Sequence, residues 1–224
     1  MTTLGPLALV GGEEFTDGCD FDADIATAAG ADAVVIVPSA AAYLDRGRHL
    51  DRARSRLAAV GLESVVLDVW DRQGAKDPGV AAQLRAARMV YVLDGAAMHL
   101  RSVLHETDSL EAIVEAWRGG AALVASGAGA DVLCDAMVDS RGGAFTVGLG
   151  VLTGLSVIPH HNRWSRDKIR RTIRLASADM TIAGIEDRTV LAHIDGEWVV
   201  RGVGSVQVYR AGTPASLADL PSPV

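Results

Sequence analysis

Short apolar runs alternate along the chain with longer segments in which apolar and polar positions recur at helical spacing. The short runs are almost purely aliphatic, which is typical of strands covered on both faces of a parallel sheet. They lie at residues 7–10, 33–37, 64–69, 89–93 and 121–125. Glycine or proline directly follows the first two runs, and the pattern predicts five short buried strands.

The intervals between these runs carry helical patterns. They fall at residues 22–29, 41–60, 79–87, 109–117 and 128–137. Regular alternation of strand and helix with short connections indicates an α/β fold, and right-handed crossovers place helices on both sheet faces. We therefore predict a doubly wound, mostly parallel sheet.

The last quarter of the chain departs from this alternation. A helical pattern at 165–177 precedes three strand-like runs at 189–194, 198–201 and 206–209. Asp195-Gly196 separates the first two runs and is a strong hairpin signal. We expect a C-terminal strand pair or meander within a single α/β domain over 1–224, with a loose tail at 213–224.

Composition narrows the class of protein. The chain has 224 residues, 49% of them hydrophobic and 22% charged, as in an ordinary globular domain. Its net charge of -7 argues against nucleic acid as a partner. Only two cysteines are present, and no apolar run or leader suggests a membrane span or signal peptide. We expect a soluble cytoplasmic protein with no membrane or nucleic-acid partner.

Candidate chemistry lies at the carboxyl ends of the predicted strands, where parallel sheets bind ligands. After the fifth strand the chain reads A-S-G-A-G-A and then becomes helical, which is the setting of a nucleophile elbow. Such a turn needs small residues two positions before and after its centre. A centre at Gly127 meets this with Ala125 and Gly129, whereas a centre at Ser126 would put the β-branched Val124 there. The elbow is therefore predicted at Gly127, which has no side chain.

Several loops together resemble the cyanophycinase and dipeptidase E family of serine peptidases, whose elbow reads G-T-S-A-G-A. The segment Gly-Gly-Glu at 11–13 resembles that family's first glycine-rich turn, and Asp-Gly-Ala-Ala at 94–97 falls at its G-G-[DN]-Q loop. Pro159-His160 falls at its histidine, 184–189 resembles its G-I-D-E-x-T segment, and 203–208 its G-x-G-x-V-x-V ending. The resemblance runs from residue 7 to 209 and implies a flavodoxin-like, class I glutamine amidotransferase-like fold.

The resemblance also implies roles for single residues. His160 would be the general base and Asp187 its orienting carboxylate, while the backbone at Gly95 and Ala128 would form the oxyanion hole. Two departures stand out. Gly127 occupies the place of the nucleophilic serine, and Ala96-Ala97 replaces the polar pair of the substrate loop.

These departures favour a homologue without acyl-enzyme chemistry that binds a small molecule, a peptide or a partner protein. The alternative is an active serine hydrolase that cleaves aspartyl peptide or isopeptide bonds through Ser126 or through a water activated by His160. A third reading makes the chain a subunit of an assembly such as a homodimer. We expect neither a cofactor nor a metal site.

Overall fold

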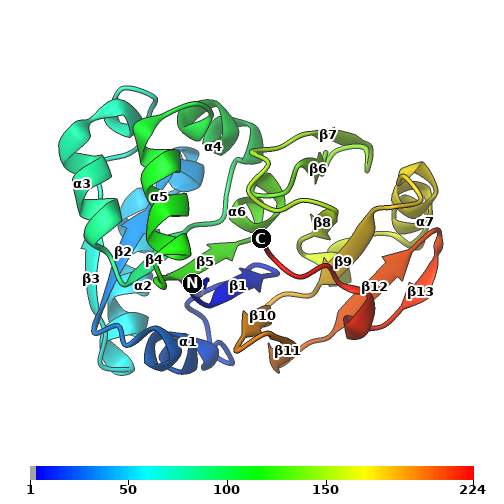
Figure 1. The fold of residues 1–224 in the computed structure, drawn as a ribbon, viewed down its shortest axis with the longest axis horizontal. Helices are drawn as coiled ribbons and strands as arrows, with labels where there is room; N and C mark the ends of the chain where they lie inside the picture. The colour runs from blue at the N-terminus through cyan, green and yellow to red at the C-terminus, as the bar shows by residue number, and fades with distance from the viewer. Residues whose placement is uncertain (1–3) are drawn as a thin grey trace.

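The computed structural model describes residues 4–224, and its centre is a seven-stranded sheet (Figure 1). The strands of this sheet are β1 (Leu7–Val10), β2 (Ala33–Val37), β3 (Glu63–Val66), β4 (Met89–Val92), β5 (Ala122–Ser126), β10 (Thr189–Ile194) and β11 (Glu197–Gly202). Their order is β11-β10-β1-β5-β4-β2-β3. The first five strands run parallel, and β10 joins β1 antiparallel.

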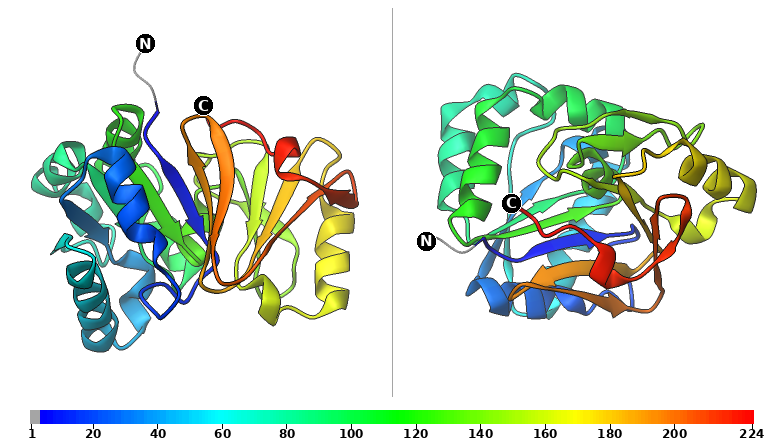
Figure 2. Two further views of the ribbon diagram at one scale, coloured as in Figure 1. Left: turned by 90° about the horizontal axis from the view of Figure 1, so that it is seen from below. Right: turned by 45° about the vertical axis from the view of Figure 1, so that its right-hand side comes forward.

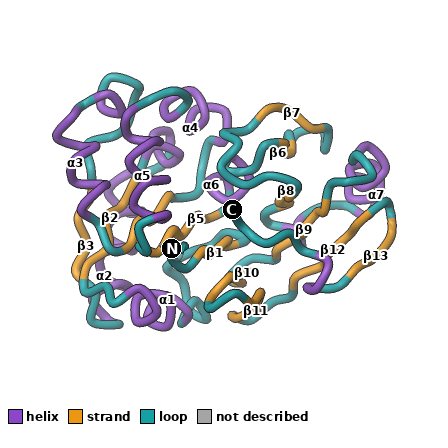
Figure 3. The backbone as a smooth tube through the Cα atoms, in the orientation of Figure 1, coloured by secondary structure: helices purple, strands orange, loops and turns teal. Residues whose placement is uncertain are grey.

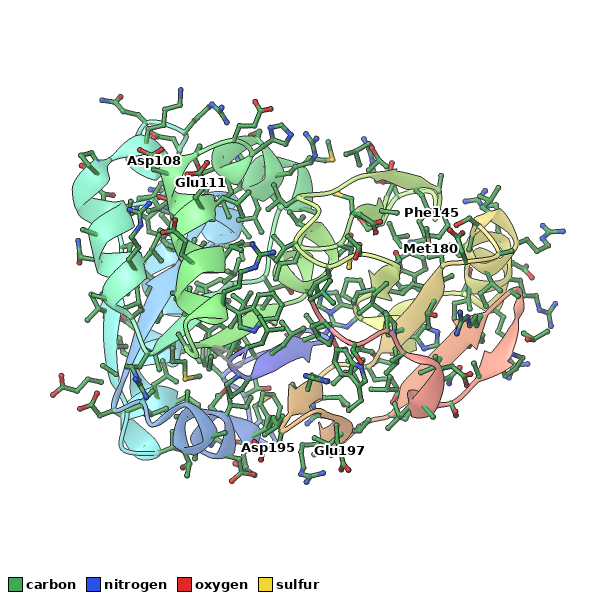
Figure 4. All side chains as sticks on the ribbon, in the orientation of Figure 1. Asp108, Glu111, Phe145, Met180, Asp195 and Glu197 are labelled. Atoms are coloured by element: carbon green, nitrogen blue, oxygen red, sulfur yellow. The ribbon has the colours of Figure 1, made fainter. Side chains whose placement is uncertain are left out.

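Helices cover both faces of this sheet. They are α1 (Phe21–Ala29), α2 (Arg46–Ala59), α3 (Pro78–Ala86), α4 (Ala97–Leu104), α5 (Asp108–Arg118) and α6 (Ala128–Val132). Apolar side chains of α1 and α2 pack into one core layer, and those of α3 to α6 pack into the other. The two views of Figure 2 show these helices on opposite sides of the strands. Asp108 and Glu111 lie in the first turn of α5, where negative charge is favourable (Figure 4).

A second sheet stands beside the first and contains four strands in the order β13-β12-β9-β8. Its elements and their neighbours are β6 (Ala136–Val138), β7 (Phe145–Val147), β8 (Leu155–Ile158), α7 (Arg166–Leu175), β9 (Thr181–Ile185), β12 (Val206–Arg210) and β13 (Thr213–Ala215). Four short 3-10 helices complete the described chain, at Ser39–Tyr43, Gly74–Lys76, His161–Arg163 and Leu217–Asp219. No helix within residues 4–224 is both long and apolar enough to cross a membrane.

The predicted α/β architecture with a mostly parallel sheet is confirmed, and so is the hairpin of β10 and β11. Asp195 and Gly196 form its two-residue loop with φ of 52° and 86°, the left-handed values that such a turn requires. The loop lies at the edge of the molecule beside the labelled Glu197 (Figure 4).

Three predicted segments differ from the structure. The helix expected at 41–60 begins only at Arg46, because the Asp45 side chain accepts a hydrogen bond from the Arg48 amide and caps a new helix there. The helix expected at 128–137 ends at Val132. Asp131 Oδ1 accepts from the Val138 amide at 2.7 Å, and the chain turns into β6.

The tail at 213–224 was expected to be loose, but it packs against the domain. β13 pairs with β12, and Leu220 is buried. The indole nitrogen of Trp198 donates to the carbonyl oxygen of Pro221 at 3.0 Å.

Elements that the apolar pattern did not reveal are α4, β6, β7, β8, β9 and β13. Gly184 interrupts the apolar run of β9, because a Cβ at this position would overlap the ring of His161. The stretch from residue 133 to 154 is mostly loop around the short strands β6 and β7 (Figure 3).

Candidate functional site

The turn between β5 and α6 places Gly127 alone at its tip. Gly127 has φ 49° and ψ -111°, and its amide donates to the Val10 carbonyl at 2.9 Å. L-residues with a side chain rarely adopt this conformation. The backbone after Gly127 also passes close to β4, since a Cβ on Gly129 would lie 3.0 Å from the Val92 carbonyl oxygen. The turn thus requires the small residues that the sequence supplies.

His160 reaches this turn from the second sheet, directly after β8 and Pro159. Its amide donates to the Gly11 carbonyl at 2.7 Å, and its backbone is left-handed with φ 50°. The imidazole lies against Gly12, where a Cβ would overlap the ring. The glycine pair after β1 therefore allows the two sheets to meet closely at this histidine.

The imidazole of His160 lies between two carboxylates. Its Nδ1 is 2.7 Å from Asp187 Oδ1, and its Nε2 is 3.0 Å from Asp94 Oδ2. Burial lowers the pKa of His160, but the hydrogen bonds and charges of Asp94 and Asp187 outweigh it and raise the pKa to about 9. The ring is consequently an imidazolium near neutral pH and donates from both nitrogens.

Asp187, after β9, is held by three further hydrogen bonds. Its Oδ2 accepts from Asn162 Nδ2 at 3.0 Å and from Arg163 Nε at 2.7 Å, while its amide donates to Asn162 Oδ1 at 3.0 Å. Arg163 also pairs with Glu13. Burial raises the pKa of Asp187, yet His160, Asn162 and Arg163 together lower it below its usual value. This carboxylate is thereby fixed in orientation toward the histidine.

Asp94 follows β4 and faces the elbow. Its Oδ1 accepts from the amides of Gly95 and Ala128, each at 2.7 Å. Burial raises the pKa of Asp94, but His160 and these two amides together lower it below its usual value. The two amides to which the sequence assigned the oxyanion hole therefore both donate to one carboxylate oxygen.

The Ser126 side chain is directed at Glu14. It is fully buried, and its hydroxyl donates to Glu14 Oε2 at 2.8 Å. The other oxygen of Glu14 accepts from the Asp94 amide at 3.1 Å and lies 3.3 Å from His49 Nε2. In this arrangement Ser126 holds the Glu14 side chain in place, and no side-chain hydrogen bond joins it to His160 within residues 4–224.

A cavity of about 340 Å³ opens beside Asp94 and His160. Backbone and small side chains of the loop after β4 form one wall, including Ala96 and Ala97, and Ala128 lines it from the elbow. The cavity is also lined by Met98, Met137, Val138 and Arg141. Of the described chain, residues 4–224, no group of three or more His, Cys, Asp and Glu side chains is arranged to hold a metal ion.

The family resemblance and the elbow pattern indicated His160, Asp187, Gly127 and the loops at 94–97 and 128, and the structure brings these together. They had not pointed to the side chains of Asp94, Asn162, Arg163 and Glu14. The polar run after His160 could have indicated Asn162 and Arg163. An acidic residue at the first position of a loop whose family pattern begins with glycine could have indicated Asp94.

Comparison with known proteins agrees with the fold and the loop order. The model of peptidase family S51 matches residues 7–201. Cyanophycinases of Synechococcus elongatus and Trichormus variabilis are each 30% identical to the chain, over 81% and 78% of its length. The chain spans 60% and 62% of the length of these two relatives.

Solved structures show the same fold. A peptidase from an acI-B1 Actinobacterium superposes with a TM-score of 0.84 at 25% identity, covering 96% of this chain and 94% of that one. A peptidase E-like protein from Listeria monocytogenes EGD-e gives 0.69 at 18% identity, over 90% and 100% of the two chains. The chain belongs to peptidase family S51, and the predicted class I glutamine amidotransferase-like fold is confirmed.

Proposed function

We propose that this chain is a non-peptidase member of the S51 family that binds a small molecule or peptide in the cavity beside His160. The observation that carries the proposal is the absence of a side chain at position 127, the centre of the turn between β5 and α6. Gly127 offers no nucleophile, and the Asp94 carboxylate fills the space above it. Without a nucleophile no acyl-enzyme forms, and the remaining groups of such a site typically supply only about 10³–10⁴-fold over water.

The state of His160 supports the same proposal. A general base must be unprotonated at its working nitrogen. Here the pKa of His160 is raised to about 9, and its Nε2 is engaged with Asp94 at 3.0 Å. An imidazolium held in this way does not activate a water at neutral pH.

The alternative of an active hydrolase would need a nucleophile from elsewhere. Ser126 would have to leave Glu14, to which it donates at 2.8 Å, and turn from a fully buried position into the cavity. A cavity of about 340 Å³ is within the usual range for small-molecule sites, so ligand binding needs no such rearrangement.

A fluorophosphonate probe, followed by intact-mass measurement, tests the proposal together with turnover of an aspartyl dipeptide and a β-aspartyl-arginine substrate. We expect no adduct and no hydrolysis above that of the His160→Ala variant, which serves as the matched control. An adduct that maps to Ser126, or hydrolysis that disappears in His160→Ala, would establish the hydrolase instead.

A further inference from the structure

Asp94 is bound in the site as a separate carboxylate ligand would be. One oxygen accepts two amide hydrogen bonds of 2.7 Å, from Gly95 and Ala128, and the other lies 3.0 Å from Nε2 of His160. Charge-assisted hydrogen bonds of this kind are among the strongest in proteins. Three donors from three different segments thus converge on one carboxylate group.

The position of this carboxylate is unusual, because it coincides with the start of a side chain at the elbow. A Cβ built on Gly127 would overlap Oδ1, Oδ2 and the carboxyl carbon of Asp94. The acidic side chain and a side chain at position 127 therefore exclude one another in this arrangement. Asp94 replaces the missing side chain both in space and as the partner of His160.

We propose that the amides of Gly95 and Ala128 and the imidazole of His160 form a carboxylate-binding centre that Asp94 masks, and that a ligand with a carboxylate on a short apolar group binds by displacing it. This inference rests on the proposed function, since it names the ligand class of the same cavity. Its physical basis is the exchange of one carboxylate for another on the same three donors.

The surroundings of Asp94 allow that exchange. Its side chain is 19% exposed and lines the cavity, so it can rotate toward water. The incoming carboxylate would regain each hydrogen bond that Asp94 gives up. Met98, which is 53% exposed, lines the same cavity and offers an apolar contact to the rest of the ligand. While the Asp94 carboxylate occupies the three donors, a free ligand cannot bind them. The apparent affinity for the ligand is therefore lowered in proportion to the fraction of molecules in which Asp94 has left the donors.

Removing the Asp94 side chain tests the proposal directly. The variant Asp94→Gly is titrated with sodium formate and sodium butyrate, and binding is followed by the NMR shifts of the Gly95 and Ala128 amides in the full chain. We expect both anions to bind at least about tenfold more tightly than to the unaltered protein, with butyrate tighter than formate. Equal affinity in the two proteins, or shifts that spare these amides, would overturn the proposal.

The matched control is Glu63→Ala, which removes one exposed carboxylate in β3, outside the cavity and away from the three donors. It should leave formate affinity unchanged within about twofold, and a gain equal to that of Asp94→Gly would reduce the effect to net charge and overturn the proposal. If Asp94→Gly does not fold, Asp94→Asn keeps the shape but loses the charge. The His160 ring shifts of Asp94→Asn should then respond to formate more strongly than those of the unaltered protein, and an equal response would contradict the proposal.

These outcomes are separable from those that test the proposed function. Fluorophosphonate labelling of the unaltered protein would remove the non-peptidase assignment but not the masked centre. Absence of formate binding in Asp94→Gly would remove the masked centre and leave the non-peptidase assignment in place.

Discussion

The carboxylate of Asp94 occupies the space in which a side chain on Gly127 would begin. The register of the sheet produces this relationship. Val92 of β4 lies opposite Ala125 of β5, so two residues further along each strand Asp94 comes beside Gly127. A carboxylate at position 94 fits beside position 127 because the residue there is a glycine.

The first prediction concerns Gly127→Ala, which should lower the free energy of unfolding by about 1–3 kcal/mol. The reason is the left-handed φ of 49° at this position together with the overlap between the new Cβ and Asp94. Urea unfolding measures the change. Gly150→Ala, at a φ of 69° with no atom within 4 Å of the added Cβ, is the matched control for backbone strain alone. Equal losses in the two variants would contradict the role assigned to Asp94.

The second prediction concerns pH and His160. Because its pKa rises from 6.5 to about 9 on folding, its ion pairs stabilise fully below about pH 6.5, and that stability is lost as pH rises through 9. Asp94 and Asp187, with lowered pKa values, limit the window at the acid end, since their contribution is lost as pH falls below 3.8. His160→Asn, which tolerates the left-handed backbone, should therefore cost at least about 1 kcal/mol more at pH 6 than at pH 10.

Urea unfolding of both proteins at the two pH values provides the measurement. Titratable groups that the unaltered protein and His160→Asn share contribute equally to both unfolding free energies, so they cancel when one is subtracted from the other. A cost that is the same at pH 6 and pH 10 would show that His160 is not charged in the folded protein.

The third prediction concerns Asp22 in α1, whose two carboxylate oxygens are buried and have no hydrogen-bond partner within residues 4–224. Burial raises its pKa to about 7, and the charge of Glu14 adds to this, although Arg56 opposes it. An acid whose pKa is raised on folding favours the folded state at low pH and opposes it as pH rises above 3.8.

Asp22→Asn should accordingly stabilise the protein relative to the unaltered chain at pH 8 by at least about 1 kcal/mol more than at pH 5. Thermal unfolding at both pH values, monitored by circular dichroism, measures the difference. Asp24→Asn, at an exposed position two residues along the same helix, is the control for removing one negative charge, and an equal pH dependence in the two variants would contradict the prediction. An Asp22→Asn effect that does not vary with pH would mean that this carboxyl group remains ionised when folded.

The fourth prediction concerns Ser126→Ala, which should destabilise the protein by about 1–3 kcal/mol because it leaves a buried oxygen of Glu14 without its donor. Formate binding to the Asp94→Gly background should be unchanged by the same substitution. Unchanged stability would instead mean that the hydroxyl is free to turn elsewhere, as the hydrolase alternative requires.

The apolar pattern predicts the parallel sheet well because strands such as β1 and β2 are continuous runs buried by helices on both faces. It fails for β8 and β9, whose runs contain Ser156 and Gly184. Gly184 is required by packing within the second sheet, against the ring of His161, and this contact has no local periodic signature.

The site shows the same division. The family resemblance indicated His160 and Asp187 because the loop motifs match in their order along the chain, and the spacing of small residues after the fifth strand indicated Gly127. The role of Asp94 depends on the register between β4 and β5 and on the direction of one side chain. Neither can be obtained from the order of residues along the chain.

The most direct test is to introduce a serine at position 127, with and without removal of the Asp94 side chain. Fluorophosphonate labelling is compared in Gly127→Ser and in the double variant Asp94→Gly/Gly127→Ser, with His160→Ala added to the double variant as control. We predict labelling of the serine introduced at position 127 in the double variant, at least about tenfold faster than in Gly127→Ser and lost with His160→Ala. Equal labelling of the single and double variants, or no labelling of a folded double variant, would contradict it.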